Sequence, residues 1–302
     1  MRTIFCESLV AEAGRPDFVF LTGDLGYKAL EPLRDAMGRR FINGGVAEQN
    51  LVSVAAGLAR EGFRPWAYSI APFIYARPFE QVRNDVCLHR LPVVLVGNGG
   101  GYGYGVMGAT HHAIEDYGVL LALPHMRAYI PAFDEDLVAQ VKLLFAIDGP
   151  AYLRLGLSEL PQGIALPRYA PWRKLLGGKG KTVVVVGPLA GGLLAATQDL
   201  SDDLRPNLWV LTELPVGEMP VEFLADIRRT DSLFVVEEHV PQGGAGRMIA
   251  HRLLETGCAP RQFAIRGAAG YVSGLYGSQK FHRQESGLDA PALVALLSGV
   301  DQ

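Results

Sequence analysis

Short runs of β-branched and aromatic residues alternate with longer stretches of helical periodicity along the whole sequence. This alternation is typical of βαβ units, in which helices connect parallel strands and cover both faces of a sheet. The sequence therefore predicts an α/β protein with mostly parallel sheets. The expected strands cover residues 18–21, 65–69, 93–97, 128–130, 152–155, 182–186, 208–211, 233–236 and 263–265.

The regular pattern is interrupted between residues 157 and 181. Prolines and then glycines gather in this stretch, and both residue types end regular elements. They are Pro161, Pro167, Pro171, Gly177, Gly178 and Gly180. A chain of 302 residues is also longer than one ordinary core requires. We therefore expect two successive α/β domains, one over residues 1–171 and one over residues 172–302.

A glycine pair precedes the most informative helix of the first domain. Gly44 and Gly45 predict a turn that leads into a helix rich in small residues, and Glu48 lies in its first turn. A glutamate at this place can simply complement the positive end of the helix dipole. The residues around Glu48 indicate a more specific role.

The segment GGVAEQNLVSVAAGLAREG, residues 44–62, resembles the glutamate-bearing helix of transketolase-type thiamine diphosphate enzymes. The similarity continues through Phe73, residues 81–85 and the loop that ends GATHHAIED, and it reaches VVEEHVPQGGAG, residues 235–246. The resemblance implies that the first domain is a pyrimidine-binding domain. It implies that the second is a transketolase C-terminal domain.

The resemblance also implies the contacts to thiamine diphosphate. Glu48 corresponds to the carboxyl that hydrogen-bonds the aminopyrimidine of the cofactor and promotes its basic imino form, and Gln49 is expected beside it. Phe73 corresponds to the residue that stacks on the pyrimidine ring, with Phe79 nearby. Ordinary core packing is the alternative for the two phenylalanines.

A glycine-rich loop follows the strand expected at residues 93–97 and matches GxGxxG from Gly103 to Gly108. A dinucleotide fingerprint begins directly at the end of a strand and opens a helix, whereas this run starts several residues later, so a nucleotide-binding oxidoreductase is a remote alternative. We expect a mobile loop that approaches substrate and cofactor. The resemblance makes His111 the histidine that contacts the substrate or assists proton transfer.

Three candidate substrate positions depart from the family pattern. Met107 stands where these enzymes usually carry an acid that binds a sugar hydroxyl, and Gly99 lies where transketolases often have a histidine. Leu157 occupies the place of an arginine that binds the sugar phosphate. Arg154 is an alternative phosphate contact, or a structural residue paired with an acid. These departures do not favour ordinary pentose-phosphate chemistry.

The GDG motif and later asparagine that hold Mg²⁺ and the diphosphate in this family do not occur in the sequence. The resemblance therefore implies a split transketolase, in which a separate N-terminal subunit supplies the diphosphate domain within an α2β2 heterotetramer. This enzyme would transfer a two-carbon ketol unit from a ketose to an aldehyde. The alternatives are a β subunit of a 2-oxo-acid decarboxylase or dehydrogenase and a non-catalytic structural partner.

The second domain contains one candidate cluster. Glu237, Glu238 and His239 precede a run of glycines, which indicates either an anion-binding loop at a helix start or a sharp connection with a subunit contact. No comparable catalytic set accompanies them in the sequence. We expect this domain to serve mainly in dimer packing.

Composition excludes several classes of protein. The net charge is −3, from 28 basic and 31 acidic residues without a basic block, so a nucleic-acid binder is not expected. The apolar runs are shorter than the ~20 residues that span a membrane, and a cytoplasmic enzyme is expected. Cys6, Cys87 and Cys258 lack CxxC spacing, which indicates buried or idle thiols rather than disulfides or a zinc site.

Overall fold

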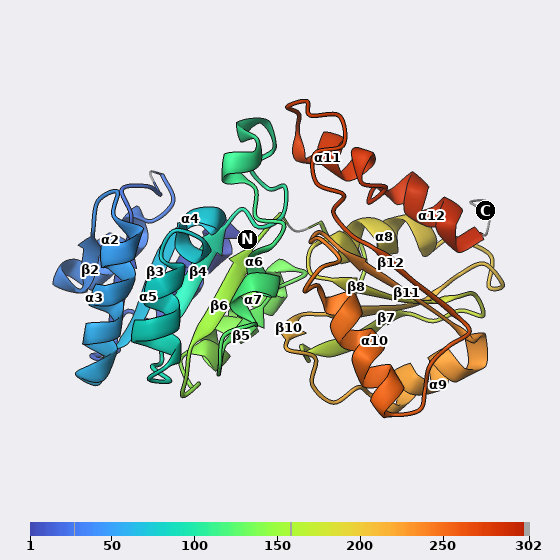
Figure 1. The fold of residues 1–302 in the computed structure, drawn as a ribbon, viewed down its shortest axis with the longest axis horizontal. Coiled ribbons are helices and arrows are strands. Elements are labelled where there is room, and N and C mark those ends of the chain that lie inside the picture. The colour runs from blue at the N-terminus through green and yellow to red at the C-terminus, as the bar shows by residue number, and fades with distance from the viewer. Residues whose placement is uncertain (27, 158, 299–302) are drawn as a thin grey trace.

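The computed structural model describes residues 1–26, 28–157 and 159–298. Within these residues the strands form two sheets that lie side by side, each flanked by helices (Figure 1). The first sheet has seven strands and the second has five. The α/β fold with two mostly parallel sheets is therefore confirmed.

The first sheet has the order β10-β5-β6-β4-β3-β1-β2. All of its pairings are parallel except that of β10 with β5. The central strands are buried on both faces, as their nearly continuous apolar runs require. The strands are β1 Phe18–Thr22, β2 Phe41–Asn43, β3 Arg64–Ile70, β4 Val94–Asn98, β5 Arg127–Tyr129, β6 Ala151–Leu155 and β10 Glu213–Leu214.

Helices cover both faces of this sheet. One face packs against α1 Arg2–Glu12, α2 Glu31–Met37 and α7 Asp134–Leu144. The other face packs against α3 Glu48–Arg60, α4 Ala71–Tyr75, α5 Phe79–Gln81, the π-helix η2 Val82–Cys87 and α6 Asp116–Leu120. Short 3-10 turns complete this half, namely η1 Gly38–Arg40, η3 Gly105–Met107 and η4 Ala109–His111.

The second sheet has the order β12-β11-β8-β9-β7, with β7 antiparallel to β9 and the other pairs parallel. Its strands are β7 Trp172–Leu176, β8 Thr182–Val186, β9 Asn207–Leu211, β11 Ser232–Glu237 and β12 Gln262–Arg266. Its helices are α8 Leu189–Thr197, α9 Val221–Thr230, α10 Ala245–Glu255, α11 Gln279–Glu285 and α12 Ala290–Ser298. Helix α11 lies against η3, so this late segment of the second half returns to the glycine-rich loop of the first half (Figure 1).

All nine expected strands are present, each within about one residue of its expected bounds, whereas β2, β7 and β10 were not expected. β2 and β10 have three and two residues, too few for a periodic pattern. β7 is an antiparallel edge strand that begins at Trp172, and the glycines that follow it obscure its pattern in the sequence. β10 comes from the second half but pairs with the first sheet, and the division at residue 172 stays a prediction.

The cysteines agree with the sequence. Cys6, Cys87 and Cys258 are free and buried. Burial raises the pKa of the Cys87 thiol to about 12, which disfavours the reactive thiolate. The prediction of buried thiols is confirmed.

Candidate active site

The candidate site lies at the edge of the first sheet where its parallel strands end. The segments that follow β2, β3 and β4 carry Glu48, Phe73 and His111, at the start of α3, in α4 and in η4 respectively. Because the carboxyl ends of parallel strands share one edge, the topology brings together residues that are far apart in the sequence. This edge is also where ligands bind in open α/β sheets.

The turn before α3 directs Glu48 into the protein. Gly45 has a φ of +72°, and a Cβ at Gly44 would lie 2.6 Å from a methyl carbon of Leu51, so both positions favour glycine. Helix α3 then begins at Glu48, as the sequence predicts. The exposed fraction of Glu48 is only 5%, whereas that of the nearby Val46 is 81%.

Both carboxylate oxygens of Glu48 have partners. The Ser69 hydroxyl donates a hydrogen bond of 3.1 Å to Oε1, and Nη1 of Arg77 lies 3.1 Å from Oε2 in an ion pair. Ser69 is fully buried in β3, whereas the Arg77 side chain is 47% exposed. The buried carboxylate is therefore held by one fixed donor and one side chain that reaches solvent.

Phe73 and His111 join this group. The guanidinium carbon of Arg77 lies 3.7 Å from the centre of the Phe73 ring, which is a close cation–π contact. The His111 ring stands edge-on to Phe73, with 5.1 Å between ring centres, and its Nδ1 lies 2.9 Å from the Thr110 hydroxyl. The structure thus places a buried carboxylate, an aromatic face and an imidazole in one cluster, which we call the Glu48 cluster.

The other residues expected around the cofactor and substrate are placed less directly. Gln49 is exposed, and Phe79 is half-buried against the core that includes α3. Met107 is 51% exposed on η3. Gly99 has a φ of +74° and lies beneath the ring of Tyr104. The functional roles of these residues stay predictions.

Arg154 is buried rather than open to a ligand. Its Nε lies 2.8 Å from Oδ2 of Asp116, and its Nη2 donates hydrogen bonds of 2.8 Å to the backbone carbonyls of Ala113 and Glu238. The charge of Arg154 is balanced inside the protein, at the junction of the two halves. The sequence allowed two roles for Arg154, a phosphate contact or a structural ion pair with an acid. Its placement beside Asp116 supports the ion pair.

Sequence reasoning missed Ser69 and Arg77. Arg77 is the only charged residue between Tyr68 and Phe79, and an isolated charge in an apolar run was the available signal. Ser69 carried no such signal, because a single hydroxyl in a buried strand is common. Their contact with Glu48 depends on how β3 and the segment after α4 lie beside the start of α3.

The glycine-rich loop docks on the second half of the protein. A Cβ at Gly100 would overlap the Arg154 side chain, and a Cβ at Gly101 would lie 2.7 Å from Glu238. The backbone N–H of Tyr102 donates a 3.0 Å hydrogen bond to Oε1 of Glu238. These glycines permit close packing of the loop on its neighbours, and the expected mobility of the loop stays a prediction.

The helix start after Glu237 is already occupied. The Glu237 carboxylate accepts hydrogen bonds from the backbone N–H groups of Ala245 (2.7 Å) and Gly246 (3.0 Å) at the start of α10. An internal carboxylate thus takes the place that an external anion would fill. Of the two interpretations of this segment, the structure supports the sharp connection.

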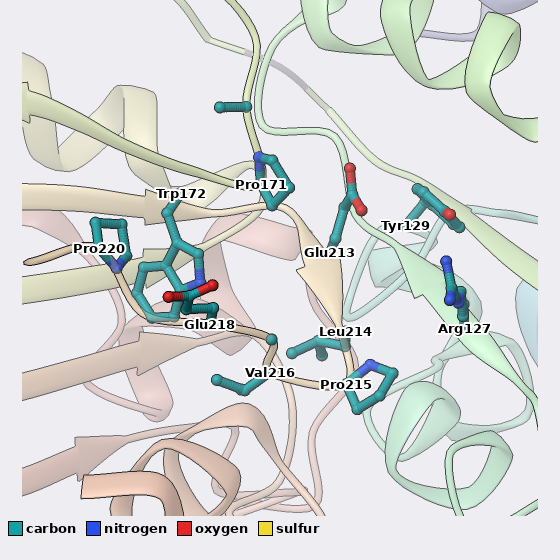
Figure 2. A pocket seen from close by; sticks show the side chains of 12 residues that line it. Arg127, Tyr129, Pro171, Trp172, Glu213, Leu214, Pro215, Val216, Glu218 and Pro220 are labelled. Atoms are coloured by element: carbon teal, nitrogen blue, oxygen red, sulfur yellow. The ribbon is translucent and has the colours of Figure 1, made fainter. Parts of the chain in front are cut away.

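Two pockets lie away from Glu48. One, of about 520 Å³, opens where β10 joins the halves, between Trp172 on one side and Arg127 and Tyr129 on the other (Figure 2). The other, of about 850 Å³, lies beside the glycine-rich loop and is lined in part by Val106 and Leu157. Neither set of described lining residues includes Glu48, Phe73 or His111.

Two further findings concern the described residues only. No three histidine, cysteine or acidic side chains gather there in an arrangement that could hold a metal ion. None of the helices in this part of the chain is long and apolar enough to cross a membrane.

Comparison with solved structures supports the fold. A structure described as a split gene transketolase, inactive beta4 tetramer, superposes with a TM-score of 0.82 at 31% identity, covering 99% of this chain and 96% of that chain. Transketolase from Campylobacter jejuni gives a TM-score of 0.77 at 17% identity, with coverage of 99% and 46%, and supports the fold alone.

Comparison with known sequences supports the family. One subunit of the apulose-4-phosphate transketolase of Actinobacillus succinogenes is 32% identical over 262 residues, which cover 85% of this chain and 83% of that subunit. The 1-deoxy-D-xylulose-5-phosphate synthase of Syntrophotalea carbinolica is 32% identical over 265 residues, but this chain spans only 40% of its length. The pyrimidine binding domain of transketolase matches residues 1–162. The chain therefore belongs to the transketolase family of thiamine-diphosphate-dependent enzymes.

Proposed function

We propose that this chain is the C-terminal subunit of a split transketolase that transfers a two-carbon ketol unit from a ketose to an aldehyde. The observation that carries the proposal is the Glu48 cluster, in which a buried carboxylate lies beside an aromatic face at the carboxyl edge of the sheet. The apulose-4-phosphate transketolase subunit and the split-gene transketolase are both similar to this chain over most of its length.

The residues present fit the aminopyrimidine of thiamine diphosphate. Glu48 and Phe73 already hold a flat, nitrogen-bearing group, the guanidinium of Arg77, by an ion pair and by stacking. In the proposed complex Glu48 bonds the pyrimidine ring and Phe73 stacks on it, with Gln49 and Phe79 close by. The cofactor, when bound, supplies the nucleophilic carbon that this transfer requires.

Glu48 and His111 are proposed to handle protons. Glu48 would share a proton with the pyrimidine ring, and its 5% exposure keeps bulk water away from that contact. His111 is half-buried on the glycine-rich loop, where an imidazole is suited to move a proton at a substrate oxygen. Met107 and Gly99 would face the substrate without a charge, which favours a less polar substrate than a sugar phosphate.

A separate N-terminal subunit is proposed to complete the site with the ligands of Mg²⁺ and the diphosphate, in an α2β2 assembly. Three large apolar side chains, Val46, Met107 and Tyr276, are 81%, 51% and 74% exposed. Val46 lies just before Glu48, and Met107 lies on the loop of His111. Tyr276 packs against that same loop at Gly108. Exposed apolar groups of this kind favour coverage by a protein partner.

Glu48→Gln in the assembled enzyme tests the proposal. Ketol transfer should fall about a hundredfold or more, because an amide cannot take or give the proton. Glu61→Gln, an exposed change at the other end of α3, is the matched control and should leave turnover unchanged. Unchanged turnover in Glu48→Gln would exclude the proposed role. Release of CO₂ from a 2-oxo acid, without ketol transfer, would favour the decarboxylase alternative.

A further inference from the structure

Arg77 occupies both features that the proposed cofactor would use. Its Nη1 is paired with Oε2 of Glu48 at 3.1 Å, and its guanidinium lies over the Phe73 ring at 3.7 Å. The other oxygen of Glu48 accepts the hydroxyl of buried Ser69. A ligand that binds Glu48 through Oε2 and stacks on this face of Phe73 therefore meets Arg77 first.

The guanidinium resembles the aminopyrimidine in shape and in bonding. Both are flat and delocalised, and both present N–H groups that donate to a carboxylate while a face stacks on an aromatic ring. Two flat groups cannot cover the same ring face at van der Waals distance. The resemblance makes Arg77 a competitor for this position.

We propose that Arg77 is a placeholder that fills the aminopyrimidine position in the free chain and swings out when thiamine diphosphate binds. The proposal rests on the proposed function, because it assumes that Glu48 and Phe73 receive this cofactor. The movement is open to the side chain, since Arg77 is 47% exposed and leaves toward solvent without crossing the core.

The placeholder protects the free chain. Without Arg77, the carboxylate of Glu48 would keep only the hydroxyl of Ser69 as a partner, and the face of Phe73 would lose the group that covers it. A buried charge without a partner destabilises the fold, and an exposed aromatic face favours unwanted association. Arg77 satisfies both groups until the partner subunit and the cofactor arrive.

The contacts that must be given up are modest. Because Arg77 is 47% exposed, its ion pair with Glu48 and its cation–π contact with Phe73 should each change an equilibrium constant by about two- to fivefold. Together they reduce the affinity for the cofactor by roughly tenfold. The effect is large enough to measure and small enough for a tight cofactor to overcome.

The test is calorimetric titration of thiamine diphosphate with Mg²⁺ into the apo complex of both subunits. Arg77→Met keeps the length of the side chain but removes its charge and its donors, and it should bind the cofactor about tenfold more tightly than the wild type. Arg77→Lys keeps the ion pair without the flat group and should fall between the two. Arg60→Met, an exposed arginine in the last turn of α3, is the matched control and should leave the affinity unchanged.

The outcomes separate this inference from the function on which it rests. If the wild-type complex binds no thiamine diphosphate, the proposed function itself fails. If the wild type binds and Arg77→Met binds equally or more weakly, Arg77 is neutral or is a ligand of the cofactor, and the placeholder is excluded. Thermal unfolding of each variant alone establishes that it is folded before the titration is interpreted.

Discussion

The protein contains two arginine–carboxylate pairs of opposite character. In the Glu48 cluster, Arg77 is 47% exposed and Glu48 is 5% exposed. At the junction of the two halves, Arg154 and Asp116 are 4% and 0% exposed. The two pairs use the same chemical groups, but only the first includes a member that can leave without disturbing the interior.

The partners of the junction pair explain this difference. Oδ2 of Asp116 also accepts the hydroxyl of Tyr152 at 2.7 Å, and Oδ1 accepts the backbone N–H of Tyr117 at 2.9 Å. Arg154 in turn bonds carbonyls from both halves. The Arg154–Asp116 pair has fixed partners on both sides and therefore stabilises the junction. In the Glu48–Arg77 pair, the exposed arginine can be replaced by another group.

The largest predicted effect is on the junction pair. Arg154→Met should lower the free energy of unfolding by about 3–5 kcal/mol, because it leaves Asp116 charged and buried without its cation. Arg77→Met, the same substitution in the Glu48 cluster, should lower it by less, about 1–2 kcal/mol, because Glu48 is buried but keeps the Ser69 hydroxyl, and Arg77 itself reaches solvent. Urea unfolding of the two variants measures both, and equal effects would show that the contrast is incorrect.

The next effect concerns pH and His239, which lies against the junction. Its ring stacks on Tyr117 with 3.8 Å between ring centres, and its Nε2 accepts the N–H of Gly118 at 3.1 Å. Burial lowers the pKa of His239 to about 4. As pH falls, His239 therefore binds a proton near pH 6.5 in the unfolded chain but only near pH 4 in the folded protein.

The free energy of unfolding should thus fall by about 3 kcal/mol through His239 as pH drops from about 6.5 to about 4. Above about pH 6.5 this group should not change it. His239→Gln keeps an acceptor for Gly118 but does not titrate, so its free energy of unfolding should fall less steeply over the same range. Urea unfolding at several pH values compares the two slopes. Parallel slopes would mean that His239 is not held neutral by the junction.

A smaller effect on stability is expected from alanine substitutions at two glycines of the first half. Gly100→Ala should destabilise the protein by about 1–3 kcal/mol, because its Cβ would overlap the Arg154 side chain at the junction. Gly57→Ala, in the exposed middle of α3, meets nothing within 4 Å. It should stabilise the free chain by about 0.5–1 kcal/mol, since alanine favours the helix. Thermal unfolding should show a lower unfolding temperature for Gly100→Ala and a higher one for Gly57→Ala. Shifts of the same sign would contradict the prediction.

The fold was largely predictable from the sequence because its strands are continuous apolar runs. β8, with Thr182–Val186 fully buried, is recognisable from its composition alone. β10 was not, because two residues become a strand only where Glu213 and Leu214 meet β5. A local pattern cannot report a pairing between residues so far apart in the chain.

The candidate site was predictable in its main residues and not in its contacts. The glycine turn placed Glu48 at a helix start, and the resemblance pointed to Phe73 and His111, which the structure brings together. Arg77 was missed, although it touches both Glu48 and Phe73. Arg154 was left between two roles, and burial decided between them.

The sequence by itself determined the α/β class, nine of the strands, the place of Glu48 in the first turn of a helix and the family to which the chain belongs. Only the tertiary structure decided which charges meet, because Glu48 and Arg77 are 29 residues apart and Tyr102 and Glu238 are 136 apart. Periodicity and turn residues act over a few neighbours along the chain. Ion pairs, stacking and burial depend on how distant elements pack. This packing buries Arg154 inside the protein and leaves Arg77 exposed to solvent.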